Sequence, residues 1–319
     1  MTKFLKTLLV IGIICVAVGY GANAAGIQIP GVEEIKEKIM NHEWDFSLDD
    51  FELDIDPFYE LEEQDYFNKD EKIYENEDSV KEAFGMNEFQ KVHVKGAGIA
   101  IKFVAYSGSE SNIGDGKSIV IHATKSGKYQ AYVKENALYI IVNGKSQKEL
   151  GEGLVEIMVP QEAYDTAQLS ITVEASAAAI ELGEMQAENV NVELSAGTIN
   201  WSGLTANELQ IAMAAGTVNG GKTIILNETD IDMKAGAVAL EGVLGKNVDI
   251  NVAAGKITLK LAHSMADYNY DLSCAGGSIK LGEERVEGIV KGREMDHQAE
   301  YDMDIECSVG TVEVSFITS

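Results

Sequence analysis

The stretch INVAAGKITL, residues 250–259, contains the pattern that decides the fold of this chain. Apolar and polar residues alternate on both sides of Gly255, which is typical of β-strands with one buried face and one wet face. Between Leu169 and Val314 the pattern returns about every nineteen to twenty-two residues, with one longer interval near the end. The corner positions of the repeats are Ala178, Gly197, Gly216, Gly236, Gly255, Gly277 and Gly310.

Residues at equal distances from these corners share one chemical character. The column five positions before the corner consists of Val173, Val192, Ile211, Ile231, Ile250, Leu272 and Ile305. The column two positions after it consists of Ile180, Ile199, Val218, Val238, Ile257, Ile279 and Val312. A fixed period near twenty residues indicates that each unit is one supersecondary turn stacked on the previous one.

A single turn of this kind cannot fold alone. Ordering about nineteen backbones costs roughly 1–2 kcal/mol each, while four inward Val, Ile or Leu side chains return only ~1.5–3 kcal/mol each. Neighbouring turns supply the remaining backbone ladders and the shared core. The sequence therefore predicts an all-β fold, a single-stranded parallel β-helix or solenoid of about 19–22 residues per rung, right-handed because such crossovers nearly always are.

Glycine occupies six of the seven corners, where positive φ is accepted without steric cost. Ala178 is the exception. Either the first corner does not need positive φ or the register shifts there.

Composition limits the possible partners. The 319 residues include 45% hydrophobic residues and carry a formal net charge of −27. Such acidity argues against nucleic acid, whose phosphates would be repelled, and it disfavours anionic lipid surfaces. Cations, basic proteins and neutral glycans remain compatible.

Residues 1–25 predict export. Lys3 and Lys6 precede an apolar run that ends in Gly-Ala-Asn-Ala-Ala, as in a signal peptide. The run from Thr7 to Ala25 is also long enough to remain as a transmembrane anchor. Both alternatives place the body outside the cytoplasm, at the cell membrane if the segment stays or secreted if it is cleaved.

Residues 26–90 are expected to form an acidic extracytoplasmic linker. Between 31 and 90 there are 21 Asp and Glu against 5 Lys, which favours a solvated, self-repelling spacer. A weak calcium or basic-partner surface is the alternative. We expect a short helix near Asp78–Phe84.

Period-two patterns then predict irregular first β rungs over 91–160 and regular solenoid repeats over 161–319. Residues 129–133 and 138–142 predict a hairpin around Lys134-Glu135-Asn136, and the run from Leu154 to Pro160 predicts a strand.

Several segments carry a family resemblance: the strand ending in Val159-Pro160, LSITVEA, VELSAGTINW, IDMKAGAVAL, INVAAGKITL and GTVEVSF. Together they make residues 89–317 resemble the bacterial surface proteins with β-strand repeats that are described as adhesins and have no known function. The resemblance implies a non-enzymatic cell-surface interaction module that contacts a protein or glycan of the cell envelope or of a host.

One motif is interpreted as a coincidence. Residues 216–223, GTVNGGKT, fit the spacing of a phosphate-binding loop, but such a loop needs a following helix. The residues that follow, 224–229, are strand-like, and Gly216 already serves as a corner.

Cys274 and Cys307 occupy the same position, three before the corner. Their Cα atoms would stack ~4.8 Å apart, within the disulfide range, and export permits oxidation. The alternative is a pair of small core residues, since the same column holds Leu194, Met213 and Val252.

A polysaccharide-active enzyme is the main catalytic hypothesis for a β-helix and would need clustered carboxylates with a basic residue on one outward face. The outward column four before the corner reads Glu174, Glu193, Ala212, Asp232, Asn251, Ser273 and Glu306, with no Lys or Arg. The histidines show no metal spacing. We therefore predict no catalytic, cofactor or metal site. An accessory subunit of a membrane envelope-sensing system is a third hypothesis.

The insertion between the last two rungs, from Gly282 to Glu300, is expected to bulge from the rod as an interaction loop. The candidate contact residues in it are Arg285, Lys291, Arg293, Asp296 and His297. Trp201 lies in an inward column and is interpreted as a core residue rather than a sugar platform.

Overall fold

The fold is taken from a computed structural model that describes residues 67–75, 77–107, 116–124, 127–143, 153–166 and 169–316. The chain separates into two units, 1–59 and 60–319, and all the described residues belong to the second. The predicted leader and most of the predicted linker lie outside the described residues. Within the described ranges, no helix has the length and apolar character needed to cross a membrane.

The part before residue 167 is built from short strands. Two small helical turns, η2 (Met86–Glu88) and α3 (Gln161–Tyr164), accompany them. The strands are β1 (Tyr74–Glu75), β2 (Ser79–Gly85), β3 (Lys91–Ala97), β4 (Ile99–Tyr106), β5 (Ser118–Thr124), β6 (Lys128–Lys134), β7 (Ala137–Asn143) and β8 (Leu154–Pro160).

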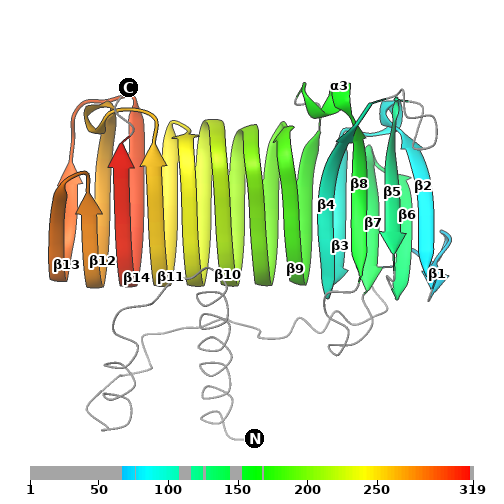
Figure 1. Cartoon of the computed structure of the whole chain (residues 1–319), viewed down its shortest axis with the longest axis horizontal. Coiled ribbons are helices and arrows are strands. Elements are labelled where there is room, and N and C mark those ends of the chain that lie inside the picture. Colours follow the sequence, from blue (N-terminus) through cyan, green and yellow to red (C-terminus); the bar gives the residue numbers. More distant parts are fainter. Residues whose placement is uncertain are drawn as a thin grey trace, which may run out of the picture. The chain divides into compact units, whose positions relative to one another are not determined.

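The part after residue 169 winds almost without interruption. Its strands are β9 (Ser170–Gln186), β10 (Asn189–Leu244), β11 (Asn247–Leu261), β12 (Tyr268–Leu281), β13 (Glu284–Met295) and β14 (Tyr301–Phe316), with the turn η4 at Met265–Asp267. Successive coils lie side by side in Figure 1, and β10 alone contains three corner glycines.

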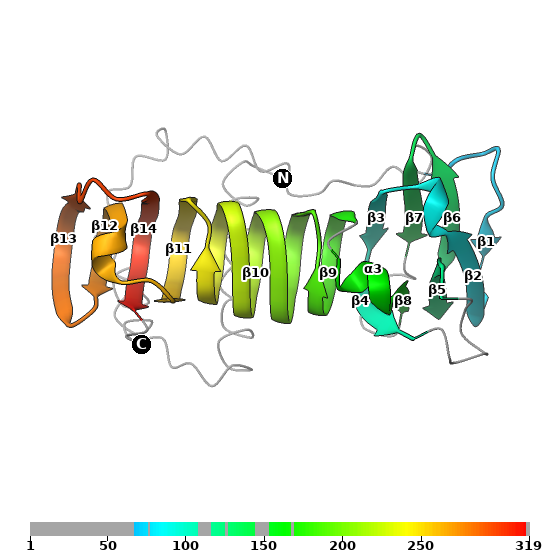
Figure 2. The ribbon, with the colours of Figure 1, turned by 90° about the horizontal axis from the view of Figure 1, so that it is seen from above.

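Each coil contributes to two layers, which are visible from above in Figure 2. The first face contains β1, β6, β7, β3 and the half of each later rung that precedes its corner. The second face contains β2, β5, β8, β4 and the half that follows the corner. The pairings show this division, because β3 pairs with Ser170–Ala175 of β9 while β4 pairs with Ala178–Glu181.

The stacked columns predicted from the repeat are present. Ile231 pairs with Ile250, Ile250 with Ile305, and Ile305 with Leu272, all in parallel register and all buried. One continuous core cluster runs from Val80 to Val314. The all-β fold is confirmed, and the parallel, in-register pairing is that of a β-solenoid. Its right hand stays a prediction.

The first corner resolves the question about Ala178. Gly197 pairs with Ala178, so the register does not shift at this corner. Ala178 is absent from the residues with positive φ, whereas Gly197 has φ +151°. The first corner therefore does not need glycine.

The order of the last rungs differs from the predicted one. The sheet runs β11–β14–β12–β13, so the C-terminal strand lies between two strands that precede it in sequence. The segment predicted to bulge as a loop is instead mostly β13, which pairs antiparallel with β12. The reason is that an open strand edge exposes unpaired N–H and C=O groups, and this segment is long enough to pair with one such edge.

The other end has a similar arrangement. Going outward from β9, the rungs are β3–β4, then β7–β8, then the antiparallel strands β5 and β6, and last β1 and β2. The β7–β8 rung thus lies inside strands that precede it in sequence. The predicted hairpin is confirmed as β6 and β7, with Glu135 and Asn136 at positive φ in the turn.

The predicted linker and the predicted short helix need correction. Residues 67–88 belong to the folded body, because β1 pairs with β6 and β2 with β5. The segment near Asp78–Phe84 is strand β2 rather than a helix, since tertiary pairing with β5 decides its conformation.

Candidate functional site

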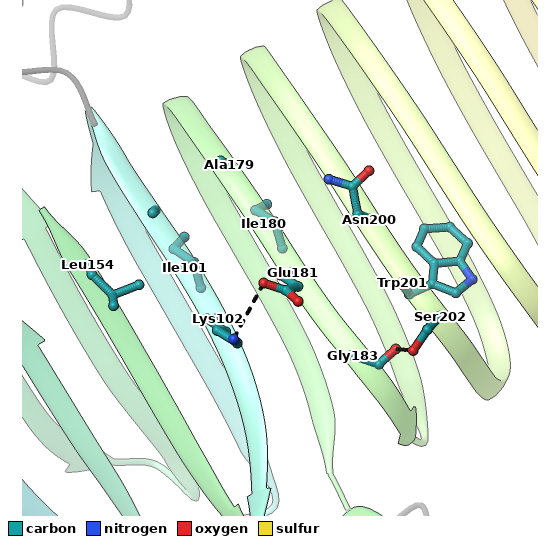
Figure 3. A pocket seen from close by; sticks show the side chains of 11 residues that line it. Ile101, Lys102, Leu154, Ala179, Ile180, Glu181, Gly183, Asn200, Trp201 and Ser202 are labelled. Atoms are coloured by element: carbon teal, nitrogen blue, oxygen red, sulfur yellow. Dashed lines mark hydrogen bonds and ion pairs between the residues drawn. The ribbon is translucent and has the colours of Figure 1, made fainter. Parts of the chain in front are cut away.

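A shallow trough lies on the second face, within the described part of the chain. Its volume is about 480 Å³, and it crosses β8, β4, β9 and the start of β10 (Figure 3). It is lined by Ala100, Ile101, Lys102, Leu154, Ala179, Ile180, Glu181, Gly183, Asn200, Trp201 and Ser202.

The trough forms where the strands cease to run evenly. β4 pairs with β9 only as far as Lys102 and Glu181, and beyond that point it pairs with β8 alone. The β9–β10 ladder shifts register on both sides of Trp201. Because Ala100 and Ala179 are small, the floor between the strands stays low.

Polar groups surround this floor. The Lys102 ammonium lies 3.8 Å from a Glu181 carboxylate oxygen, and both side chains are about half exposed. The Asn219 amide donates to Asn200 Oδ1 over 3.0 Å, and the Ser202 hydroxyl donates to the Gly183 carbonyl. The trough thus offers an ammonium, a carboxylate and amide groups to a ligand with hydroxyl or amide groups.

Trp201 supports the trough from below. Its ring is buried, and Nε1 donates to Thr223 Oγ1 over 3.0 Å. A Cβ atom at Gly220 would lie 2.2 Å from the indole, so the glycine makes room for the ring. The prediction that Trp201 is a core residue is confirmed.

The phosphate-loop motif is also explained by the rung structure. Residues 216–223 lie within β10, and the following residues 224–229 continue that strand. The hydroxyl of Thr223, which a phosphate loop would direct to a metal ion, is buried against Trp201.

Cys274 and Cys307 are paired in register on β12 and β14, as predicted. In the structure both are free, buried thiols, and Cys274 Sγ lies 3.5 Å from the Gly310 carbonyl. Burial and the neighbouring Cys274 raise the pKa of Cys307 to about 12. The disulfide stays a prediction, which titration of thiols in the unreduced, unfolded protein tests.

The structure does not gather the predicted interaction residues into one loop. Arg285, Lys291 and Arg293 belong to β13, and Asp296 and His297 follow it in the turn to β14. His297 has a structural role there. Its ring Nδ1 lies 2.7 Å from the Tyr268 carbonyl oxygen, and its backbone N–H donates to Asn269 Oδ1. A contact role for the five residues stays a prediction.

A carboxylate column on the first face was not found from the sequence. Asp230, Asp249, Asp304 and Asp271 are direct cross-strand neighbours in that spatial order. Burial, followed by the neighbouring carboxylates, raises the pKa of Asp230 and of Asp304. Across the described ranges, no three His, Cys, Asp or Glu side chains are grouped to hold a metal ion.

These pairings define a repeat protein of the parallel β-solenoid class. Residues 109–315 match the family described as Toastrack DUF4097. The match covers well over half of the chain, so the chain belongs to this family, and the resemblance based on the β-strand repeats is confirmed.

Two solved structures are among those that the chain matches. One is described as a "putative cell adhesion protein" from Clostridium sporogenes ATCC 15579, with 14% identity, coverage of 75% of this chain and 98% of that chain, and a TM-score of 0.29. The other is described as a "putative adhesin" from Bacteroides fragilis NCTC 9343, with 13% identity, coverage of 74% and 96%, and a TM-score of 0.36. No curated protein matches the chain.

Proposed function

We propose that this chain is a non-enzymatic, adhesin-like cell-surface module that holds a macromolecule of the cell envelope or of a host surface in the second-face trough. The observation that supports this proposal is the trough itself, with its low apolar floor and polar border. Ligand-binding sites commonly combine an apolar lining with a few oriented polar groups in this way.

The rigidity of the rod favours such a role. The trough lies on strands that are each paired with a neighbour, and Trp201 fills the space beneath it. A preformed surface loses little conformational freedom on binding, so more of the contact energy appears as affinity. A ligand that carries hydroxyl or amide groups fits the acidity of the chain, because the negative net charge disfavours polyanions.

The predicted leader supports a location outside the cytoplasm, attached to the membrane or secreted. Protease treatment of intact cells tests this location. We expect the body to be digested without cell lysis. Protection until the cells are opened would contradict the surface role.

Filling the trough tests the contact site. Ala179 is exposed on the trough floor, so Ala179→Trp blocks the floor without entering the core. Ala212→Trp is the matched control, because Ala212 is exposed on the first face. We expect attachment of cells displaying the chain to immobilised envelope or host extracts to fall about tenfold with Ala179→Trp, a loss typical of a blocked contact centre, and to stay unchanged with Ala212→Trp.

The same preparations distinguish the rival functions. New reducing ends released from polysaccharides by the purified chain would replace this proposal with the enzymatic one. Stable co-purification with one membrane protein, together with unchanged attachment in the Ala179→Trp variant, would favour an accessory subunit of an envelope-sensing system.

A further inference from the structure

The first face carries a row of six neighbouring side chains that the sequence repeat did not identify as a site. Tyr132 of β6 pairs with Tyr139 of β7, Tyr139 with His93 of β3, and His93 with Thr172 of β9. Thr172 pairs with Asn191 of β10. The next coil is displaced by nineteen residues, because the Asn207 N–H donates to the Glu188 carbonyl. Gln210 therefore lies beside Asn191 on that coil.

Three rings form one end of this row. The centroids of Tyr132 and Tyr139 are 5.2 Å apart with nearly parallel planes, and those of Tyr139 and His93 are 5.1 Å apart with a 43° tilt. All three side chains are partly exposed. The rings therefore form a partly exposed aromatic patch and stabilise one another across the strands.

Neutral hydrogen-bonding groups form the other end. Thr172, Asn191 and Gln210 lie at successive steps of ~4.8 Å along the rod axis. Among the residues that the structure describes, neither these three side chains nor the two phenol hydroxyls of the row have a hydrogen-bond partner. By contrast, the side chains of Asn200 and Asn219 on the second face are hydrogen-bonded to each other.

Flanking groups mark the two ends of the row. At the Tyr132 end, the buried Gln130 of the same strand β6 holds the segment Asn68–Glu71. Its side chain accepts from the Asn68 N–H and donates to the Asn68 and Glu71 carbonyls. Beyond Gln210 the same row continues as the aspartates of the carboxylate column. Polyanions would be repelled at that end.

The row itself is uncharged near neutral pH. Burial, reinforced by Lys95 and Lys91 and opposed by Glu174, lowers the pKa of His93, so its imidazole is neutral there. A partner with many hydroxyl groups, apolar C–H faces and no charge matches these properties. C–H groups with partial positive charge are attracted by the negative faces of aromatic rings.

We propose that the row Tyr132–Tyr139–His93–Thr172–Asn191–Gln210 is a binding site for a neutral linear oligosaccharide that lies along the rod axis. The site is on the opposite face from the trough and is independent of the adhesin-like role proposed above. Five strand spacings of ~4.8 Å give it a length of about 24 Å, which favours a chain of several sugars over a single one.

The test uses the full chain in detergent and three hexasaccharides: β-1,4-linked glucose, β-1,4-linked N-acetylglucosamine and α-1,4-linked galacturonate. Titration calorimetry measures each affinity. We expect one of the neutral hexasaccharides to bind and the galacturonate to bind at least about tenfold more weakly. We expect Tyr139→Ala to weaken the neutral complex about tenfold as well, because it removes the central ring.

Variants that leave the aromatic ladder intact keep the test decisive. Gln210 is exposed, and Gln210→Ala removes one hydrogen-bonding group from the row. The affinity for the oligosaccharide should therefore fall while the thermal stability of the chain stays the same. Asn247→Ala, exposed on the same face but outside the row, is the matched control and should bind normally. The proposal is overturned if neither neutral hexasaccharide binds, if galacturonate binds better, or if Tyr139→Ala and Gln210→Ala both bind like the unmodified chain. Ala179→Trp leaves this row unchanged. Its effect on cell attachment therefore tests the trough alone, and the oligosaccharide titrations test the row alone.

Discussion

The corner glycines are required by the neighbouring coil as well as by their own backbone angles. A Cβ atom built on Gly277 would lie 1.7 Å from the Gly310 carbonyl oxygen, and one on Gly255 would lie 1.8 Å from that of Gly236. The parallel stack therefore brings each corner carbonyl against the next glycine. From the sequence only the positive φ could be argued, because the close approach depends on which coil is adjacent.

A pair of adjacent glycines isolates this effect. Gly277→Ala should lower the free energy of unfolding by more than the ~1–3 kcal/mol of a strained backbone, since the carbonyl must also move. Gly276→Ala should have little effect, because its Cβ would meet its nearest neighbour at 3.8 Å and its φ is not positive. Urea unfolding of both variants measures the difference. Equal losses would contradict this explanation of the corners.

The carboxylate column predicts how stability depends on pH. Asp230 and Asp304 have a pKa raised above the ordinary aspartate value of 3.8, so the folded chain keeps protons that the unfolded chain has already lost. Ionising them costs stability. Their contribution to the free energy of unfolding therefore decreases as pH rises from about 3.8 through the raised pKa, and it stays low above it.

Asp249 lies between these two aspartates, and its negative charge helps to raise the pKa of both. Asp249→Asn should raise the free energy of unfolding at neutral pH by ~0.2–1 kcal/mol, the usual size of a like-charge cross-strand pair. The gain should shrink below pH 4 and in high salt. Asp70→Asn, an exposed site outside the column, is the control with the same change in net charge. Thermal melts across pH 3.5–8 measure both, and no gain over Asp70→Asn would contradict the repulsion.

At the scale of elements, the C-terminal strand is an interior strand of the sheet. β14 pairs with β11 along one edge and with β12 along the other, over nearly its whole length. A chain that ends at residue 300 would therefore have a gap between β11 and β12, and the buried surfaces of Ile305, Cys307, Val312 and Val314 would be missing.

Deletion of 301–319 should consequently abolish cooperative unfolding rather than shorten the rod by one rung. Circular dichroism melts and limited proteolysis measure this. A synthetic peptide of residues 299–319, added to the shortened chain, should restore protection because both ladders are available to it. A shortened chain that melts at the original temperature would show that β14 is dispensable.

The strands themselves were largely predictable, but their order at the two ends was not. The alternation from Leu154 to Pro160 gives β8 with its observed bounds, and the turn at Glu135 and Asn136 gives the β6–β7 hairpin. The helix expected near Asp78–Phe84 is a strand because β5 provides a partner 39 residues later. Periodicity predicts which residues form a rung. It does not predict which strand lies beside which, because that depends on which exposed strand edge each segment pairs with.

The same distinction applies to the sites. The inward positions of Trp201 and of the two paired cysteines follow from their columns, because burial repeats with the rung. The trough depends on where β4 leaves β9, and the row on the first face depends on β7 lying beside β3. Both contacts join segments in the irregular part of the chain, where no repeat length relates them.

At the scale of the whole molecule, the middle of the rod should accept further coils. Residues 228–246 form one nineteen-residue coil that pairs with the next at constant register from Glu228 to Met233 and again past the corner. A second copy of 228–246 placed after Lys246 should fold and lengthen the body by ~4.8 Å. Small-angle scattering measures the length, and a molten or aggregated product would contradict the independence of the coils.

The antiparallel strand β13 has a consequence for how such proteins lengthen. A parallel coil added beyond β13 would meet a strand of the opposite direction, whereas a coil inserted between β9 and β11 would have a parallel neighbour on each side. Gene duplication within the middle of the chain, in whole multiples of one coil, is therefore the route by which inheritance can set the size of the body.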